Sequence, residues 1–378
     1  MSPLKSRLLL RGDSIIGGGM KMSQTVVVGM SGGVDSSVAA YLLKQQGYEV
    51  VGVTMQIWQE EAARVQEENG GCCGLSAVED ARRVAECLGI RHYVMNFRED
   101  FQKQVIDYFV REYREGRTPN PCIACNRYVK WESLLQRSLE IGADSIATGH
   151  YARICRLPNG RLALKKSVTA AKDQTYALYS LTQRQLAHTQ MPVGEYEKSD
   201  VRKLAVEAGL PVADKPDSQE ICFVPDGDYA AFIERETGED SEPGNFVDMY
   251  GNVLGRHKGI THYTVGQRKG LGLAMGHPVF VAEIRPDTKE VVIGEQEDVF
   301  KRSLRANQLN LMSVPELDGE MRAVAKIRYN HVGDSCVVRM VGQDVAEVIF
   351  DQPQRAVTPG QAVVFYDGDI VVGGGTII

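Results

Sequence analysis

The sequence predicts an α/β fold, in which a doubly wound parallel sheet is followed by a small β-rich region and a β-barrel. From Thr25 to about residue 148, short apolar, β-branched runs alternate with segments of helical periodicity, as in a parallel sheet covered by helices. After Phe232 the helical periodicity fades and short β-rich runs follow one another. Of the 378 residues, 43% are hydrophobic and 24% charged, which excludes a disordered or fibrous protein.

The first part of the chain supplies the parallel sheet. The expected strands are Thr25–Val28, Glu49–Thr54, Arg91–Met95 and Ser145–Thr148. The expected helices are Ser36–Gln46, Ala77–Leu88, Phe101–Glu115 and Tyr128–Glu140. The later β-rich runs are 279–284, 290–293, 323–327, 337–340, 346–350 and 362–365, a spacing that suggests antiparallel sheet or a small barrel.

These patterns divide the chain into four expected regions. Residues 1–22 form a disordered extension, 23–220 a catalytic domain, 221–296 a central β-rich domain, and 297–378 a C-terminal β-barrel. No apolar run reaches the roughly 18–20 residues of a membrane span. Eight cysteines in this length do not make a disulfide scaffold, and no signal peptide is recognised. We therefore expect a cytoplasmic protein with no membrane partner, whose net charge of −6 leaves room for a local basic face.

A glycine-rich turn lies between the first expected strand and helix. It reads Gly29-Met30-Ser31-Gly32-Gly33-Val34-Asp35-Ser36. Glycines let the backbone approach an anion, and the helix N-terminus behind them offers free N–H groups. No lysine follows the glycines, so the turn is not a Walker A loop. It resembles the PP-loop of ATP pyrophosphatases, which hold the pyrophosphate of ATP during adenylation; the alternative is an ordinary strand-to-helix turn.

Three cysteines stand in distinctive surroundings. Cys122 and Cys125 follow two prolines, just ahead of a helix that we expect to begin near Cys125, where the helix dipole would favour a thiolate. Cys222 lies in an expected loop. The cysteines as a group are open to four interpretations: inert buried thiols, which suits Cys87, Cys155 and Cys336, a zinc site, a redox pair, or sulfur transfer through a persulfide.

Taken together, the motifs resemble the tRNA-specific 2-thiouridylase family. They are GMSGGVDSS (29–37), CCG (72–74), GRTPNPCIACN (116–126), ATGHYAR (147–153), KDQTYAL (172–178), SQEICF (218–223), TVGQRKGLG (264–272) and TPGQAVVFY (358–366). The resemblance implies a HUP-like PP-loop enzyme that uses ATP and Mg²⁺ to adenylate the C2 oxygen of the tRNA wobble uridine. A cysteine persulfide then supplies sulfur, delivered by a cysteine desulfurase or a relay protein, and AMP and pyrophosphate are released.

The resemblance also implies roles for individual residues. Cys125 matches the nucleophile and Cys222 the persulfide carrier, and the two form a disulfide when sulfur leaves. ATP-binding positions are Gly29, Met30, Ser31, Gly32, Gly33, Val34, Asp35, Ser36, Met55 and Gly149. Positions that meet tRNA or its target base are Asn120, Pro121, Cys122, His150, Lys172, Asp173, Gln174, Arg328, Tyr329 and Gln361. The central domain over residues 221–296 is also expected to bind tRNA, together with the C-terminal barrel.

One residue departs from the pattern. Many family members have aspartate, assigned to acid–base work, at Cys122, and a thiol is a different acid from a carboxyl group. Cys122, Cys125 and Cys222 therefore also fit an alternative, a [4Fe–4S] cluster that presents the sulfur. The role of Cys72 and Cys73 stays open. Rival functions are a PP-loop ligase for a small molecule, a tRNA lysidine synthetase and a non-catalytic RNA-binding protein.

Overall fold

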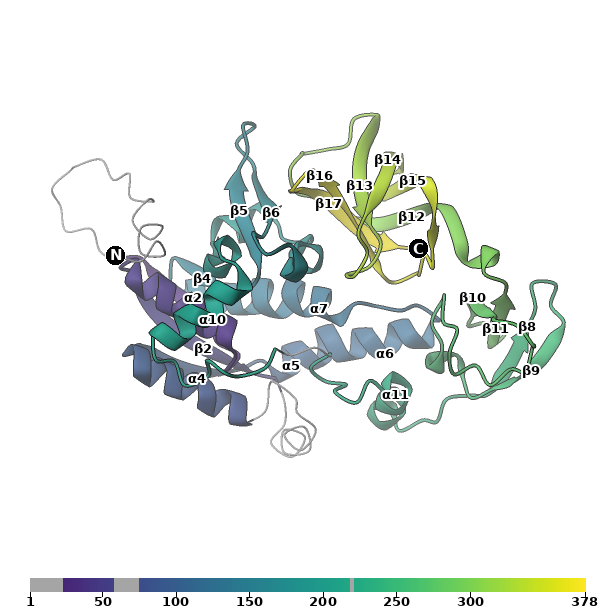
Figure 1. Ribbon diagram of the computed structural model, residues 1–378, viewed down its shortest axis with the longest axis horizontal. Coiled ribbons are helices and arrows are strands. Elements are labelled where there is room, and N and C mark those ends of the chain that lie inside the picture. Colours follow the sequence, from purple (N-terminus) through teal and green to yellow (C-terminus); the bar gives the residue numbers. More distant parts are fainter. Residues whose placement is uncertain (1–22, 58–74, 218–220) are drawn as a thin grey trace.

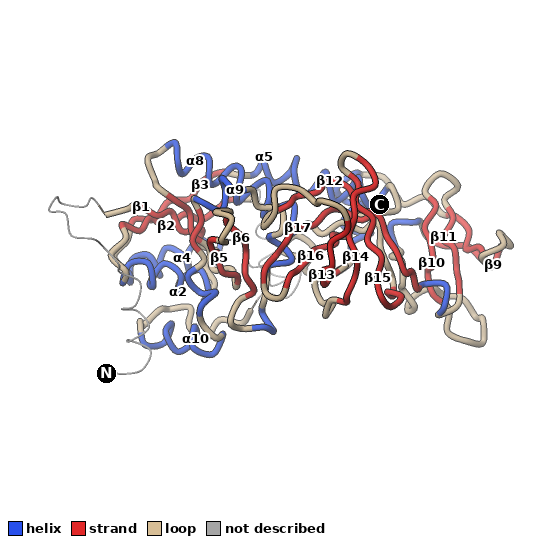
Figure 2. Tube along the Cα trace, turned by 90° about the horizontal axis from the view of Figure 1, so that it is seen from above, coloured by secondary structure: helices blue, strands red, loops and turns tan. Residues whose placement is uncertain are grey.

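The computed structural model describes residues 23–57, 75–217 and 221–378. The expected extension over residues 1–22 and the Cys72–Cys73 pair lie outside these ranges. A parallel sheet occupies one end of the elongated molecule, a small four-stranded sheet the other end, and a β-barrel lies between them (Figures 1 and 2). In the described part of the chain, no helix combines the length and the apolar character that crossing a bilayer requires.

The parallel sheet has the strand order β3-β2-β1-β4-β7, and every neighbouring pair is parallel. Its strands are β1 (Thr25–Gly29), β2 (Glu49–Gln56), β3 (Arg91–Asn96), β4 (Ser145–Ala147) and β7 (Thr189–Gln190). The first four strands confirm the expected α/β sheet. Strand β7 was not expected, because two residues carry no detectable periodicity.

Alternate residues of β1 face opposite layers of helices. Val26 and Val28 pack with α2 (Val34–Gln45), α4 (Leu75–Leu88) and α10 (Lys198–Glu207). Val27 packs on the other face, against two long helices. The first comprises α5 (Arg98–Phe101), η1 (Gln102–Ile106) and α6 (Asp107–Arg114), and the second α7 (Pro121–Ala124), η2 (Cys125–Leu134) and α8 (Leu135–Glu140). A continuous apolar strand is thus buried on both sides, as in a doubly wound fold.

The second long helix begins earlier than expected. Asn120 caps it, since its side-chain oxygen accepts hydrogen bonds from the N–H groups of Cys122 (3.1 Å) and Ile123 (3.3 Å), and Pro121 fills the first helical position. The start near Cys125 is therefore wrong, because the asparagine cap lies five residues upstream. Both long helices contain a π-helical stretch, and such stretches often mark functional sites.

A hairpin from the first half of the chain joins the barrel. Strands β5 (Ala152–Arg156) and β6 (Leu162–Lys166) extend the C-terminal sheet, through the pairing of Lys165 with Ile370. The short helices that follow are η3 (Ala170–Lys172), η4 (Thr175–Leu178), α9 (Gln183–Ala187) and η5 (Pro192–Glu195). The hairpin therefore fixes the barrel against the parallel sheet.

The two later sheets differ in closure. The small sheet, in the order β10-β11-β8-β9, is mixed, since β11 and β8 run parallel. It comprises β8 (Gly244–Val247), β9 (Val253–His257), β10 (Phe280–Arg285) and β11 (Glu290–Gly294), preceded by α11 (Tyr229–Thr237). The barrel closes because β12 pairs with both β15 and β17. Its strands are β12 (Phe300–Leu311), β13 (Glu320–Lys326), β14 (Asp334–Gly342), β15 (Val345–Arg355), β16 (Ala362–Asp367) and β17 (Ile370–Ile377).

Candidate active site

The glycine turn connects β1 to the N-terminus of α2. Gly33 precedes the helix and no side chain caps it, so the first N–H groups of α2 can meet an anion. Gly32 has φ 68°, and a Cβ there would collide with the backbone of Ala77. The Ser36 hydroxyl accepts a hydrogen bond from the Ser31 N–H at 3.2 Å. The turn thus has the shape of a phosphate cradle.

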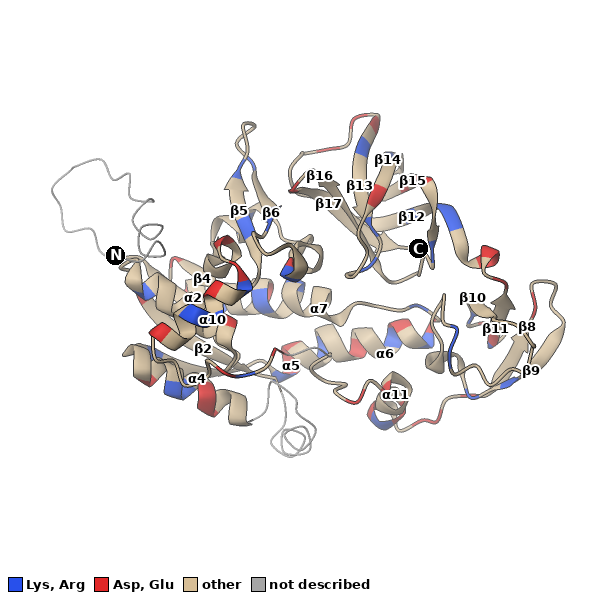
Figure 3. Cartoon of the chain, viewed as in Figure 1, with Lys and Arg blue, Asp and Glu red and all other residues tan. Residues whose placement is uncertain are grey.

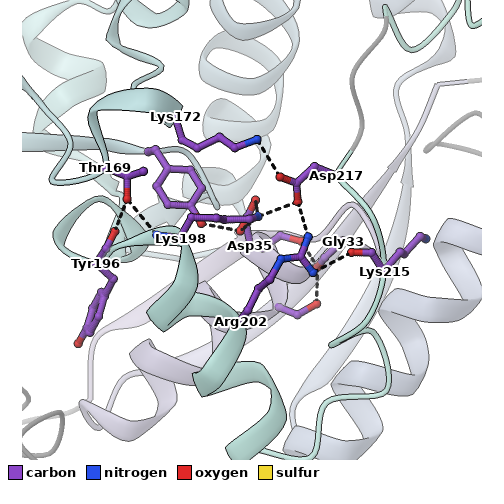
Figure 4. A network of polar contacts seen from close by, with 12 residues as sticks. Gly33, Asp35, Thr169, Lys172, Tyr196, Lys198, Arg202, Lys215 and Asp217 are labelled. Carbon is purple, nitrogen blue, oxygen red and sulfur yellow. Dashed lines mark hydrogen bonds and ion pairs between the residues drawn. The ribbon is translucent and has the colours of Figure 1, made fainter.

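Asp35 is held by two partners across the cradle. The Tyr151 hydroxyl donates to Oδ1 at 2.7 Å, and the Lys198 ammonium lies 2.7 and 2.9 Å from the two carboxylate oxygens. Lys198 also pairs with Asp217 at 2.9 Å (Figure 4). The Lys198 side chain is only 14% exposed, so this ion pair is shielded from solvent.

Asp217 gathers three cations. Lys172, Lys198 and Arg202 each lie 2.9 Å from its carboxylate (Figure 4). Burial alone would raise the pKa of Asp217, but the hydrogen bonds from Lys198 and Lys172 outweigh it and lower the pKa to about 2. Lys172, expected to meet tRNA, thus lies beside the nucleotide cradle.

The segment Thr148–Tyr151 contacts both the cradle and the long helix formed by α7, η2 and α8, which contains Cys122 and Cys125 and is called the cysteine helix below. A Cβ on Gly149 would lie 2.5 Å from the Ser36 nitrogen and 2.6 Å from the Asp35 carbonyl carbon, so only glycine allows this contact. His150 faces the other way, with its ring centroid 5.4 Å from that of Trp131 and its Nε2 3.5 Å from the Lys130 ammonium. The Tyr151 hydroxyl again contacts the cradle, through its hydrogen bond to Asp35. Four consecutive residues therefore join the two candidate sites.

Cys125 lies one turn inside the cysteine helix rather than at its start. Burial raises the pKa of the Cys125 thiol, and Cys122 raises it further, while Lys130 lowers it. The expected stabilisation of a thiolate by the helix N-terminus is therefore wrong for Cys125 in this structure. Cys122 sits in the first turn and is exposed.

His150 is held in the neutral form. Burial lowers its pKa well below the ordinary histidine value, and the positive charge of Lys130 lowers it further. Its Nδ1 lies 2.7 Å from the Thr148 hydroxyl. A neutral imidazole between Lys130 and Trp131 can take part in hydrogen bonding to a base without adding charge.

Met55 and Cys222 lie against the same apolar cluster as Cys125. Cys222 stands in a turn, five residues after Asp217 in the sequence. No disulfide joins any of the six described cysteines. Met55, Cys125 and Cys222 therefore pack against one extended apolar cluster.

The remaining predicted tRNA residues divide into two groups. Tyr329 is 39% exposed, packs edge-on against Tyr176 at 6.3 Å, and has its pKa raised by burial and then by Asp173 and Cys122. Asp173 and Gln174 instead hold the local backbone, through the N–H groups of Ser167 (3.0 Å) and Tyr151 (2.9 Å).

Gln361 links the barrel to the segment ahead of the cysteines. Its side-chain amide donates to the Thr118 carbonyl at 2.8 Å, and the Thr118 N–H donates to the Pro359 carbonyl at 2.8 Å. The barrel therefore forms one wall beside Asn120 and Cys122.

The cysteines do not fit a metal cluster in this structure. Among the described residues, no three His, Cys, Asp or Glu side chains are arranged to hold a metal ion. As placed in the described structure, Cys122, Cys125 and Cys222 therefore do not form a ready [4Fe–4S] or zinc site. The Asp35 carboxylate, in the first turn of α2, is of the type that binds Mg²⁺ together with the phosphates of a nucleotide.

Sequence reasoning missed three residues of the cradle. Tyr151 stands in a motif that we used, but nothing there signalled its contact with Asp35. Asp217 flanks the Cys222 motif, and its acidity next to a loop was the available signal. Lys198 gave no signal, because it reaches Asp35 across 163 residues of sequence.

The fold and the site define a PP-loop enzyme of the HUP class with two appended β domains. Family models match three consecutive parts of the chain: a tRNA methyl transferase HUP domain (residues 24–226), a tRNA methyl transferase PRC-barrel domain (230–295) and an aminomethyltransferase beta-barrel domain (301–377). The chain belongs to the tRNA-specific 2-thiouridylase family, as its curated relatives show.

Two of these relatives are named tRNA-specific 2-thiouridylase MnmA. The protein from Lachnoclostridium phytofermentans is 70% identical over 93% of this chain and 99% of its own length. The protein from Clostridioides difficile is 56% identical over 95% of this chain and 99% of its own length. Among solved structures, NMN synthetase from Francisella tularensis has 16% identity and a TM-score of 0.33, covering 58% of this chain and 79% of that one.

Proposed function

We propose that this protein catalyses ATP-dependent 2-thiolation of the wobble uridine of tRNA. The observation that carries the proposal is the segment Gly149–Tyr151, in which Gly149 and Tyr151 contact the phosphate cradle and His150 between them contacts the cysteine helix. An adenylating centre and a sulfur centre that share one segment can act on the same carbon atom. The names of the relatives support tRNA as the substrate.

The cradle carries out the first step. ATP phosphates bind to the N–H groups of Gly29–Ser36, and Met55 and Gly149 line the nucleotide site. The C2 carbonyl oxygen of uridine attacks the α-phosphate, and pyrophosphate leaves. Mg²⁺ held with Asp35 supplies charge neutralisation when bound. Lys198 and Tyr151 hold the Asp35 carboxylate in place.

The cysteines carry out the second step. A sulfur donor, a cysteine desulfurase or a relay protein, loads Cys222 with a persulfide. The terminal sulfur forms a bond to C2, and AMP leaves with the C2 oxygen. Cys125 then attacks the Cys222 sulfur, so that the thiocarbonyl remains on tRNA and a Cys125–Cys222 disulfide forms, which an external thiol reduces. We assign Cys122, which is exposed in the first turn of α7, to contact with the reacting base.

The base pocket is formed by residues around Cys122. Asn120 and Pro121 give it a rigid edge, His150 a neutral hydrogen-bonding group, and Tyr329 a face for stacking. The proposal implies a cytoplasmic location, where tRNA and reduced thiols are both present.

Nucleoside mass spectrometry tests this function. Cells that lack the gene are expected to lose 2-thiouridine at the wobble position, and the wild-type gene should restore it. Cys125→Ala and Cys222→Ser are expected to restore none, while Cys336→Ala, a buried thiol in the barrel, should restore it fully. Normal thiolation by Cys222→Ser would contradict the persulfide step, and normal 2-thiouridine without the gene would contradict the function.

A further inference from the structure

Two arginines lie together between the barrel and the small sheet without a carboxylate to neutralise them. The Arg328 guanidinium donates to the carbonyl of Arg355 at 3.0 Å, and Arg355 in turn donates to the carbonyl of Gly266 at 3.2 Å. Arg355 also covers the Phe280 ring at 5.2 Å. Within the described ranges, neither arginine forms an ion pair.

Two other arginines of the barrel, Arg322 and Arg339, differ from this pair in having carboxylate partners. Arg322 pairs with Asp351 at 2.9 Å, and Arg339 pairs with Glu347 at 2.7 Å. Acidic and basic segments are likewise interspersed along much of the chain (Figure 3). Burial lowers the pKa of Arg328, and the charge of Arg355 lowers it further, so the pair disfavours its own ionisation. A binding anion would relieve this repulsion.

The TVGQRKGLG motif forms a fixed loop beside the pair. The Gln267 side chain accepts from the Thr264 N–H and donates to the Lys269 carbonyl, both at 3.0 Å. The Gly266 N–H donates to the Val281 carbonyl at 2.7 Å. Gly266 has φ 86° and leaves no room for a Cβ beside Ala356 of the barrel. The loop is thus held in place by its own hydrogen bonds, by β10 and by close contact with the barrel.

This loop presents two further cations to solvent. Arg268 and Lys269 are exposed, and neither forms an ion pair with another described residue. Tyr329 and Arg328 are neighbours in the chain. Hydrogen bonds then connect Arg328 to Arg355, and Arg355 to Gly266 of the loop. Tyr329 lies near Cys122, so the cations lead away from the proposed base pocket.

We propose that Arg355, Arg268 and Lys269 bind successive phosphates of the tRNA strand that flanks the target uridine. The inference rests on the proposed function and extends it. The central domain as a whole was expected to bind tRNA, but Arg328 and Tyr329 were the only individual residues of this surface expected from the sequence to do so. Guanidinium groups match phosphate oxygens in geometry, and arginines already anchored to carbonyls lose little side-chain freedom on binding. Phosphates bound in register hold the strand while one base leaves the stack.

Salt-dependent binding of unmodified tRNA, measured without ATP, tests the proposal. Arg355→Gln is expected to weaken binding about tenfold and to reduce the slope of log K against log salt by about 0.7–0.9, the effect of one lost phosphate contact. Arg268→Gln with Lys269→Gln should reduce the slope by about twice that amount. In turnover, KM for tRNA should rise while kcat stays near that of the wild type.

Arg322→Gln is the matched control, because it removes an exposed barrel arginine that Asp351 already neutralises. Its slope should equal that of the wild type; an equal loss in the control would mean that only net charge matters, and would overturn the proposal. Unchanged tRNA affinity with slower sulfur delivery in the Arg268/Lys269 variant would assign the surface to an acidic sulfur carrier and overturn it. Wild-type protein that fails to bind tRNA would refute the proposed function itself. The exposed Arg268 and Lys269 side chains make a folding defect in that variant unexpected, so the result does not depend on Arg355 alone.

Discussion

The two halves of the candidate active site treat charge in opposite ways. In the phosphate cradle, Lys198 forms ion pairs with both Asp35 and Asp217 at 2.7–2.9 Å. On the cysteine side, burial suppresses charge, since the pKa of Cys125 is raised and the pKa of His150 is lowered. An anionic substrate needs fixed countercharges, whereas a sulfur atom directed at a carbon needs a site from which water is excluded. The comparison suggests that the shared segment Gly149–Tyr151 separates two environments as well as joining them.

The most direct test of this difference is to disable one half of the candidate active site at a time. Asp35→Asn keeps the size of the side chain but removes its charge, and we expect tRNA-dependent pyrophosphate release to fall by about 10²–10³-fold. Cys125→Ala should keep pyrophosphate release near the wild-type rate while thiolation is abolished. Loss of both steps in both variants would show that the halves are not separable.

The segment between the halves is the next target. Gly149→Ala would place a Cβ 2.5 Å from the Ser36 nitrogen, so the cradle must shift. We expect a stability loss of about 1–3 kcal/mol and weaker ATP binding, measured by urea unfolding and calorimetry. Gly342→Ala, where the nearest atom is an ordinary 3.5 Å away, should stay within about 0.5 kcal/mol of the wild type. Equal effects at both glycines would contradict the close contact.

The pH dependence of Cys125 reactivity tests the cysteine half of the site. The thiolate is the reactive form, and burial raises the pKa of Cys125, so its alkylation rate should still be rising above the ordinary thiol range. Lys130→Gln removes the cation that lowers this pKa, and the profile should move to still higher pH. Mass spectrometry of the Cys125 peptide measures the rate.

A lysine from the opposite face of the sheet provides the control for this profile. Lys203→Gln removes a cation of α10 that pairs with Asp200, and it should leave the Cys125 profile unchanged. A shift toward lower pH in Lys130→Gln would show that Lys130 does not act on the thiol as a positive charge.

The smallest effect is expected where the barrel meets the cysteine segment. Gln361→Ala removes one hydrogen bond to the Thr118 carbonyl and should cost about 1 kcal/mol of unfolding free energy. Gln343→Ala, in an exposed turn of the barrel, should cost less than about 0.5 kcal/mol. If urea unfolding does not separate the two variants, Gln361 does not fasten the barrel to this wall.

Much of the parallel sheet could be predicted, because its strands are continuous apolar runs bounded by helical periodicity and glycines. Strand β7 could not be predicted, because its two residues carry no periodicity. The start of α7 at Pro121 could not be predicted either, because the Asn120 cap outweighs the hydrophobic pattern downstream. The pairing of the β5–β6 hairpin with the barrel sheet could not be predicted either, because the sequence of a hairpin does not encode which sheet edge it will join.

For the site, the sequence by itself determined the phosphate cradle and the cysteine segment. Both depend on local chemistry: glycines that permit a tight turn, and prolines with asparagine that fix a helix start. Only the tertiary structure decided the electrostatics. Burial reversed the expectation for the Cys125 thiol, and folding brought Lys198 and Asp217 to Asp35 and set Arg355 beside Arg328. Desolvation and charge pairing depend on distances between residues far apart in sequence, and no local pattern encodes those distances.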